Sequence, residues 1–139
     1  MASIDLYAIG NALVDSEYEV SDALLQSLGV EKRHMTLIDA DRRSFLEQGV
    51  QGKHSRHTGG GSAGNTVVAL SQLGGKAFYA CRVADDALGH FYRDDLAANG
   101  VQSNLVDGLA NSGQTGTCMV MVTPDAERSM STFLGATSE

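Results

Sequence analysis

The sequence predicts an α/β fold with an open, mostly parallel sheet and helices on both of its faces. Residues 63–73 carry apolar side chains at helical spacing and end at Gly74-Gly75, and the apolar run 77–81 follows at once. A helix that leads directly into such a run is typical of a parallel crossover, with the strand buried on both faces. Residues 117–122 alternate with a period of two, and a return strand starts at Met130 after the turn at 123–126, which adds a β-hairpin.

The first half of the chain contains short strands and short helices. Residues 4–9 read as a largely buried strand, and Gly10-Asn11 ends it with a turn at the edge where open α/β sheets bind ligands. Residues 17–20 and 35–38 read as further strands. Ser21 between them is expected to cap a short helix.

A second short helix is expected over residues 42–48. Asp39 or Asp41 would cap it, and Phe45 and Leu46 would point inward. Residues 101–106 fit a short edge strand.

A longer helix is expected after the acidic pair Asp85-Asp86. Either carboxylate can cap it, so capping explains the acidic start without a catalytic role. Its expected apolar side consists of Leu88, Phe91, Tyr92 and Leu96.

Composition and net charge limit the classes of function that the chain can have. With 139 residues, 42% apolar content, one Pro and no long apolar run, the chain is expected to be one globular domain, or part of one, without a membrane span or signal peptide. A net charge of -7 argues against nucleic acid or an anionic membrane as the main partner. Cys81 and Cys118 lie in apolar runs and are expected to be reduced thiols, which fits a cytoplasmic location.

The glycine-rich stretch 59–64 leads straight into a helix. Such a junction exposes unpaired backbone N–H groups at the positive end of the helix dipole, and a ligand can approach the backbone closely. As a dinucleotide fingerprint it matches Gly-x-Gly-x-x-Gly, with Asp85-Asp86 about 20 residues on, but the preceding residues 51–58 are polar rather than a buried strand. As a P-loop it has Thr66 in place, but Asn65 stands where the lysine should be.

Asn65 offers both a donor and an acceptor in the first helical turn, which suits a neutral polyhydroxylated ligand such as a sugar. A plain glycine-rich turn with a capped helix remains the alternative. Three of the four histidines, His34, His54 and His57, fit no zinc spacing, so no metal site is expected from them.

The segment Gly60-Gly61-Ser62-Ala63-Gly64-Asn65 resembles the Gly-Gly-x-x-x-Asn signature of the ribokinase-like, or PfkB, family of carbohydrate and nucleoside kinases. The resemblance extends to Gly10-Asn11-x-x-x-Asp15, to the segment 83–89 and to the hairpin from Thr115 to Arg128, in the family's order. It therefore covers the whole chain, and is strongest to the adenosine-kinase and sugar-kinase branches.

The resemblance implies a phosphotransferase that passes the γ-phosphoryl of ATP, with Mg²⁺, to a hydroxyl of a sugar or nucleoside. It implies that Asn11, Asp15 and Asn65 hold substrate hydroxyls, that Gly60 and Gly61 permit close approach and act as a hinge, and that Arg128 can stabilise charge near the transferred group. Strands at about 16–20, 34–38, 51–57 and 116–133 would form a lid over the substrate and a possible homodimer contact.

The family's second signature, of the Asp-Thr-x-Gly-Ala-Gly-Asp kind, supplies the general base and the anion hole, and residues 134–139 do not resemble it. Residues 1–139 are therefore expected to be the N-terminal, acceptor-binding portion, without the ATP-binding part and inactive alone. The alternatives are a non-catalytic sugar- or nucleoside-binding module and a dinucleotide-binding domain.

Overall fold

The computed structural model describes residues 3–53 and 55–139, which form two compact units. Unit 1 contains the residues up to Val14, Gly59–Gly116 and Gly135–Glu139, and unit 2 contains Asp15–Thr58 and Thr117–Leu134. The chain therefore leaves one unit for the other after Val14, Thr58, Gly116 and Leu134.

Unit 1 is built on a parallel sheet of three strands in the order β1-β5-β6. β1 spans Leu6–Ile9, β5 spans Ala77–Ala80 and β6 spans Gln102–Ser103. Helix α3 (Ser62–Gln72) precedes β5, and helix α4 (Ala87–Ala98) connects β5 to β6. The predicted parallel crossover is therefore confirmed.

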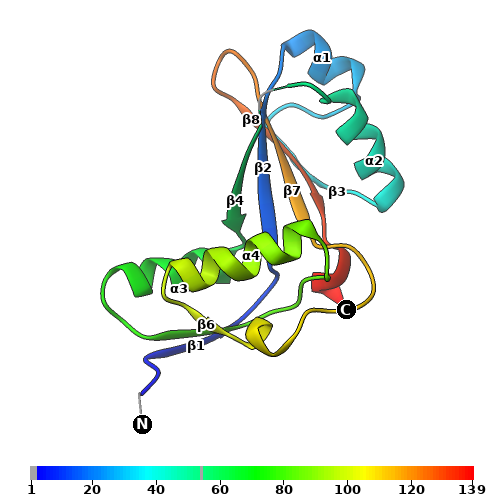
Figure 1. Ribbon diagram of the computed structural model, residues 1–139. Helices are drawn as coiled ribbons and strands as arrows, with labels where there is room; N and C mark the ends of the chain where they lie inside the picture. The colour runs from blue at the N-terminus through cyan, green and yellow to red at the C-terminus, as the bar shows by residue number, and fades with distance from the viewer. Residues whose placement is uncertain (1–2, 54) are drawn as a thin grey trace. The chain divides into compact units, whose positions relative to one another are not determined.

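Both helices of unit 1 cover the same face of its sheet (Figure 1). Val67 of α3 and Tyr92 of α4 pack in one hydrophobic core with the inward side chains of β1 and β5. On the opposite face, Tyr7 and Ile9 are 67% and 81% exposed. The predictions that residues 4–9 are largely buried and that residues 77–81 are buried on both faces do not hold for that face, because the described residues supply a helical layer only to the other one.

The ends of the unit 1 helices follow the predicted capping signals. Asp86 caps α4, accepting a 2.8 Å hydrogen bond from the Gly89 amide. Helix α3 stops before Leu73, which is 87% exposed, and Gly74 takes the left-handed conformation with φ of 93°. The edge strand expected over residues 101–106 is shorter than predicted, because the 3₁₀ turn η1 (Asn104–Asp107) follows β6 directly.

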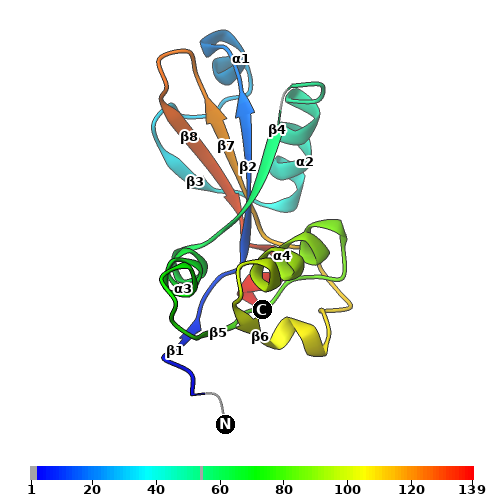
Figure 2. The same cartoon turned by 60° about the vertical axis from the view of Figure 1, so that its left-hand side comes forward.

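Unit 2 is built on a five-stranded sheet in the order β3-β8-β7-β2-β4 (Figure 2). Its strands are β2 (Leu13–Glu19), β3 (Met35–Leu37), β4 (Ser55–Gly60), β7 (Thr117–Val122) and β8 (Arg128–Phe133). β7 and β8 form the predicted antiparallel hairpin, and β3 pairs with β8 in parallel. β4 lies at the edge, where its exposed polar side chains are stable in water.

Helices α1 (Asp22–Ser27) and α2 (Ala40–Gly49) begin at the predicted caps Ser21 and Asp39. They bury a second core with one face of the unit 2 sheet, made of Val20, Leu25, Leu28, Leu46, Val50, Met119 and Met121.

Phe45 does not point inward as predicted. It is 49% exposed, with the Arg42 guanidinium 5.1 Å from its ring centroid, whereas its neighbour Leu46 is fully buried. Within residues 3–53 and 55–139, none of the helices has the length and apolar character that crossing a membrane requires.

A short 3₁₀ turn, η2 (Gly135–Ser138), closes the described chain inside unit 1. The Ala12 amide donates a 2.7 Å hydrogen bond to Thr137 Oγ1, and the Ala136 amide donates to the Gln114 carbonyl at 2.8 Å. These bonds hold the last residues beside the segment that follows β1 and beside Gln114.

Candidate functional site

The glycine junction lies in unit 1, where β4 ends at Gly60 and α3 begins at Ser62. Gly61 between them has φ of 92°, and a Cβ atom there would collide with the backbone oxygen of Asn11. The structure therefore brings Asn11 and Gly61 together. The packing of the chain alone already requires glycine at position 61, whatever ligand the junction receives.

The first turn of α3 is open to a ligand. It has no side-chain cap hydrogen bond. Asn65 is exposed in that turn, and its backbone N–H donates to the Gly61 carbonyl at 2.8 Å. Backbone N–H groups at such a helix start can bind polar or anionic groups.

Asp85 and Asp86, the acidic pair that a dinucleotide site would use to bind the ribose, both already have partners within the protein. Asp86 accepts hydrogen bonds from the Gly89 amide at 2.8 Å, and from the amide and hydroxyl of Thr115 at 2.9 and 2.6 Å. Asp85 pairs with His90 at 2.6 Å. With an exposed edge strand before the glycines as well, these contacts count against a dinucleotide fingerprint.

A cavity of about 380 Å³ opens in unit 1 at the carboxyl ends of β1 and β5. Asn11 lines it, together with Arg82 and Asn104. The Asn104 side chain accepts from the Cys81 amide at 3.0 Å and donates to the Cys81 carbonyl at 2.9 Å, which fixes the end of β5. Burial raises the pKa of Cys81 to about 12, so its thiol stays protonated and unreactive.

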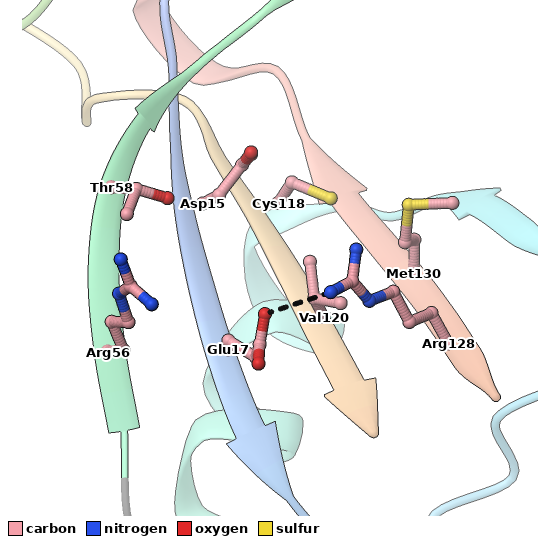
Figure 3. A pocket seen from close by; sticks show the side chains of 8 residues that line it. All are labelled: Asp15, Glu17, Arg56, Thr58, Cys118, Val120, Arg128 and Met130. Carbon is pink, nitrogen blue, oxygen red and sulfur yellow. Dashed lines mark ion pairs between the residues drawn. The ribbon is translucent and has the colours of Figure 1, made fainter. Parts of the chain in front are cut away.

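A second cavity, of about 360 Å³, lies in unit 2 on the sheet face opposite α1 and α2 (Figure 3). Four neighbouring strands line it with Asp15, Glu17, Arg56, Thr58, Cys118, Val120, Arg128 and Met130. Its floor is apolar, from Val120, Cys118 and Met130, and its walls are charged.

The two carboxylates that line this cavity have different surroundings. Glu17 and Arg128 form an ion pair at 3.8 Å between exposed side chains. Asp15 is half-buried, and loss of hydration raises the pKa of its carboxyl above the ordinary value. An apolar floor with carboxylate and guanidinium walls can hold a ring against the floor and bind hydroxyl or phosphate groups at the walls.

The structure thus brings Asp15 and Arg128 into one cavity in unit 2, and Asn11 and Gly61 into contact in unit 1. Whether the residues of the two units bind a common ligand stays a prediction.

Sequence reasoning missed three of the polar residues around the unit 2 cavity. Glu17 stands two residues after Asp15 on β2, and Arg56 and Thr58 stand two residues apart on β4. The period of two that places alternate residues on one face of a strand could have linked Glu17 to Asp15, but Arg56 and Thr58 reach this cavity only through the order of the strands in the sheet.

The histidines form no metal centre in the part of the chain that the structure describes. His34 pairs with Glu31 at 3.4 Å, and His57 Nδ1 is 2.9 Å from Ser16 Oγ. His54 lies outside the described residues. Over the described ranges, no three His, Cys, Asp or Glu side chains are grouped as a metal ion would require.

Known kinases share this fold. Over 99% of its length the chain matches an adenosine kinase from Sinorhizobium meliloti, with a TM-score of 0.84 and 40% sequence identity. It matches a probable sugar kinase from Rhizobium etli over the same share, with a TM-score of 0.83 and 37% identity. The likeness confirms the predicted ribokinase-like α/β fold.

The model of the pfkB family carbohydrate kinases matches residues 31–139, so the chain belongs to the pfkB family, as its motifs predicted. A fructokinase from Solanum tuberosum is 32% identical over 69 residues, which are 50% of this chain and 21% of the fructokinase. The chain covers 41% of the adenosine kinase and of the probable sugar kinase. It therefore spans well under half the length of these relatives.

Proposed function

We propose that this chain supplies the acceptor-binding part of a kinase that phosphorylates a hydroxyl group of a sugar or nucleoside. The observation that carries the proposal is the unit 2 cavity, with the half-buried carboxylate of Asp15 above an apolar floor and the Arg128 guanidinium on the same face. A carboxylate accepts hydrogen bonds from two vicinal hydroxyls at once, and an apolar floor suits the face of a sugar or base ring. The volume of about 360 Å³ admits a ligand of that size.

The proposed roles follow the chemistry of each side chain. Asp15 accepts from acceptor hydroxyls, and the amides of Asn11 and Asn65 both donate to and accept from hydroxyls. Gly60 and Gly61 let the ligand approach the backbone, and they form the hinge for closure of the unit 2 strands as a lid.

Arg128 neutralises charge near the transferred phosphoryl group. For this role it exchanges its contact with Glu17 for a contact with phosphate, and an exposed pair at 3.8 Å costs little to break.

ATP and Mg²⁺ belong to the proposed reaction, but the described residues do not fit the metal, because they contain no cluster of metal ligands. We assign ATP binding and the general base to polypeptide outside these 139 residues. Accordingly, we propose that the 139-residue chain binds the acceptor but does not catalyse phosphoryl transfer at a useful rate by itself.

The test is thermal protection of the intact protein by ribose, adenosine and fructose. At least one of them raises the Tm, and Asp15→Ala abolishes this shift because the hydroxyl acceptor is lost. Glu19→Ala is the matched control, since Glu19 is a carboxylate on the same strand that does not line the cavity. Protection that persists in Asp15→Ala at the same ligand concentration would contradict the assignment.

Two further measurements separate the alternatives. Transfer of labelled phosphate from ATP to the protecting ligand identifies a kinase, whereas protection without transfer by the intact protein identifies a binding module. A Tm shift with NAD and none with ribose would identify a dinucleotide-binding domain.

A further inference from the structure

A buried hydrogen bond links helix α4 to the glycine junction of unit 1. The Tyr92 hydroxyl donates to the Gly60 carbonyl at 2.8 Å, and the Tyr92 side chain is only 2% exposed. Gly60 is itself buried, so its carbonyl lies where water does not readily replace the phenol.

The same phenol also packs against the start of α3. A Cβ atom on Gly64 would lie 2.5 Å from the Tyr92 hydroxyl oxygen, and one on Gly59 would lie 3.8 Å from the edge of the Tyr92 ring. Tyr92 therefore lies next to three glycines of the junction: Gly59 and Gly60 at the end of β4, and Gly64 in the first turn of α3. The glycine at position 64 makes this close packing possible, whereas at position 59 the ring is at ordinary contact distance and the close neighbour of a Cβ would be the Asp95 carboxylate at 2.5 Å.

The hydroxyl is a donor at neutral pH. Burial raises the pKa of Tyr92 above the ordinary value of a phenol, so the group keeps the proton that it donates to the Gly60 carbonyl.

Gly61, which follows the anchored residue Gly60, sets the direction in which the backbone leaves β4. Its φ of 92° and its contact with the Asn11 backbone turn the chain from β4 into α3, and its carbonyl accepts the Asn65 amide at 2.8 Å. The residue before this turn is held by Tyr92. A shift of the Gly60 carbonyl would therefore be passed on to the first turn of α3, which carries Asn65.

We propose that Tyr92 is a positioning residue for acceptor binding: by holding the Gly60 carbonyl, it fixes the direction in which Gly61 and Asn65 present their polar groups to the acceptor. The inference rests on the proposed function, because the acceptor is what the junction would contact. Tyr92 itself is buried and acts through the junction.

The experiment uses Tyr92→Phe, which keeps the ring and removes only the hydroxyl. Tyr7→Phe is the control. Tyr7 is a phenol of the same unit that lies on the open face of the sheet, 67% exposed and stacked on Phe78, so its hydroxyl is away from the core that holds the junction. Acceptor affinity is measured by calorimetry with adenosine and fructose, and amide hydrogen exchange is measured residue by residue over positions 59–66.

We expect Tyr92→Phe to weaken binding of the preferred acceptor about tenfold, as loss of one buried hydrogen bond would, and to speed amide exchange at the junction. Tyr7→Phe should change neither quantity. If Tyr92→Phe leaves acceptor affinity unchanged, or speeds exchange uniformly over unit 1 instead of at the junction, the positioning role is wrong.

Failure of the proposed function gives a different result. If the unsubstituted protein binds neither probe, acceptor binding itself is contradicted, and the exchange data still decide whether Tyr92 holds the junction. Faster exchange confined to positions 59–66 then supports that role, and unchanged exchange overturns it.

Discussion

In unit 1 the sheet face opposite the helices carries Tyr7 and Ile9, whereas in unit 2 the corresponding face carries Asp15, Glu17 and Arg128. Each sheet is covered by two helices on one side, so the amount of helical cover does not distinguish the units. The difference lies in the side chains of each strand that point to the open face of the sheet, away from the helices. This open face is apolar in unit 1, whereas in unit 2 it is polar on β2 and β4, mixed on β8 and apolar on β7, and the edge strand β3 exposes Met35 and Leu37.

The two open faces behave differently in water. Exposed apolar surface has an unfavourable hydration free energy, which even the stacking of Tyr7 on Phe78, with ring centroids 4.9 Å apart, relieves only in part. A charged face is stable in water and remains available for a polar ligand. This difference supports the proposal that a ligand binds unit 2 on its open face.

The largest expected effect tests the covered faces. Leu46→Ala in unit 2 and Leu96→Ala in unit 1 remove buried side chains and should each lower the free energy of unfolding by about 2 to 5 kcal/mol. Ile9→Ala on the open face of unit 1 should change it by less than about 0.5 kcal/mol. Urea denaturation measures all three. An Ile9→Ala cost as large as that of Leu96→Ala would show that the open face is covered in solution.

A second test concerns the exposed apolar face directly. The dye ANS, which binds exposed apolar surface, should bind the 139-residue chain, and Ile9→Ser should lower its fluorescence about twofold, because Ile9 is 81% exposed beside Tyr7. Val106→Ser is a control, since Val106 is an exposed apolar residue of unit 1 outside this sheet. Equal losses in both variants would mean that the sheet face is not a distinct apolar patch.

A third test concerns the carboxylate on the charged face. Because desolvation raises the pKa of Asp15, the folded state holds the proton of this carboxyl more tightly than the unfolded state does. Above both pKa values the charged carboxyl therefore destabilises the fold, so Asp15→Asn should raise the Tm at neutral pH. The gain should shrink as the pH falls through the folded-state pKa, where the native residue is protonated too.

Melting curves from about pH 8 to about pH 4 measure this difference. A gain in Tm that grows on acidification would mean that the pKa of Asp15 is lowered instead. In that case the carboxylate would be held by partners of its own, and the open face of unit 2 would be less available to a ligand.

Local sequence signals predicted the elements of both units well, because their causes are local. Ser21, Asp39 and Asp86 cap helices as expected, and the period of two over residues 117–122 gave the hairpin. A cap depends on a side chain and an amide three residues away, so no knowledge of the tertiary fold is needed.

Burial and site membership were harder to predict, because they depend on distant residues. Ile9 and Phe45 are apolar yet exposed, which reflects where the helices pack and not their own residue types. Arg56 joins Asp15 in one cavity only because β4 is placed beside β2 in the sheet. Motif resemblance gave Asp15 and Arg128 as candidates, and both line the cavity, but it could not reveal Arg56, whose position depends on strand order.

The smallest expected effect concerns the ion pair between Glu17 and Arg128. The two side chains are 44% and 66% exposed and 3.8 Å apart, so Glu17→Gln and Arg128→Gln should each change the free energy of unfolding by less than about 0.5 kcal/mol. The same urea experiment measures this. A cost above about 2 kcal/mol would mean that the pair supports the sheet itself. Arg128 would then be committed to the fold, and the contrast between an apolar face and a charged face free to bind ligand would no longer hold.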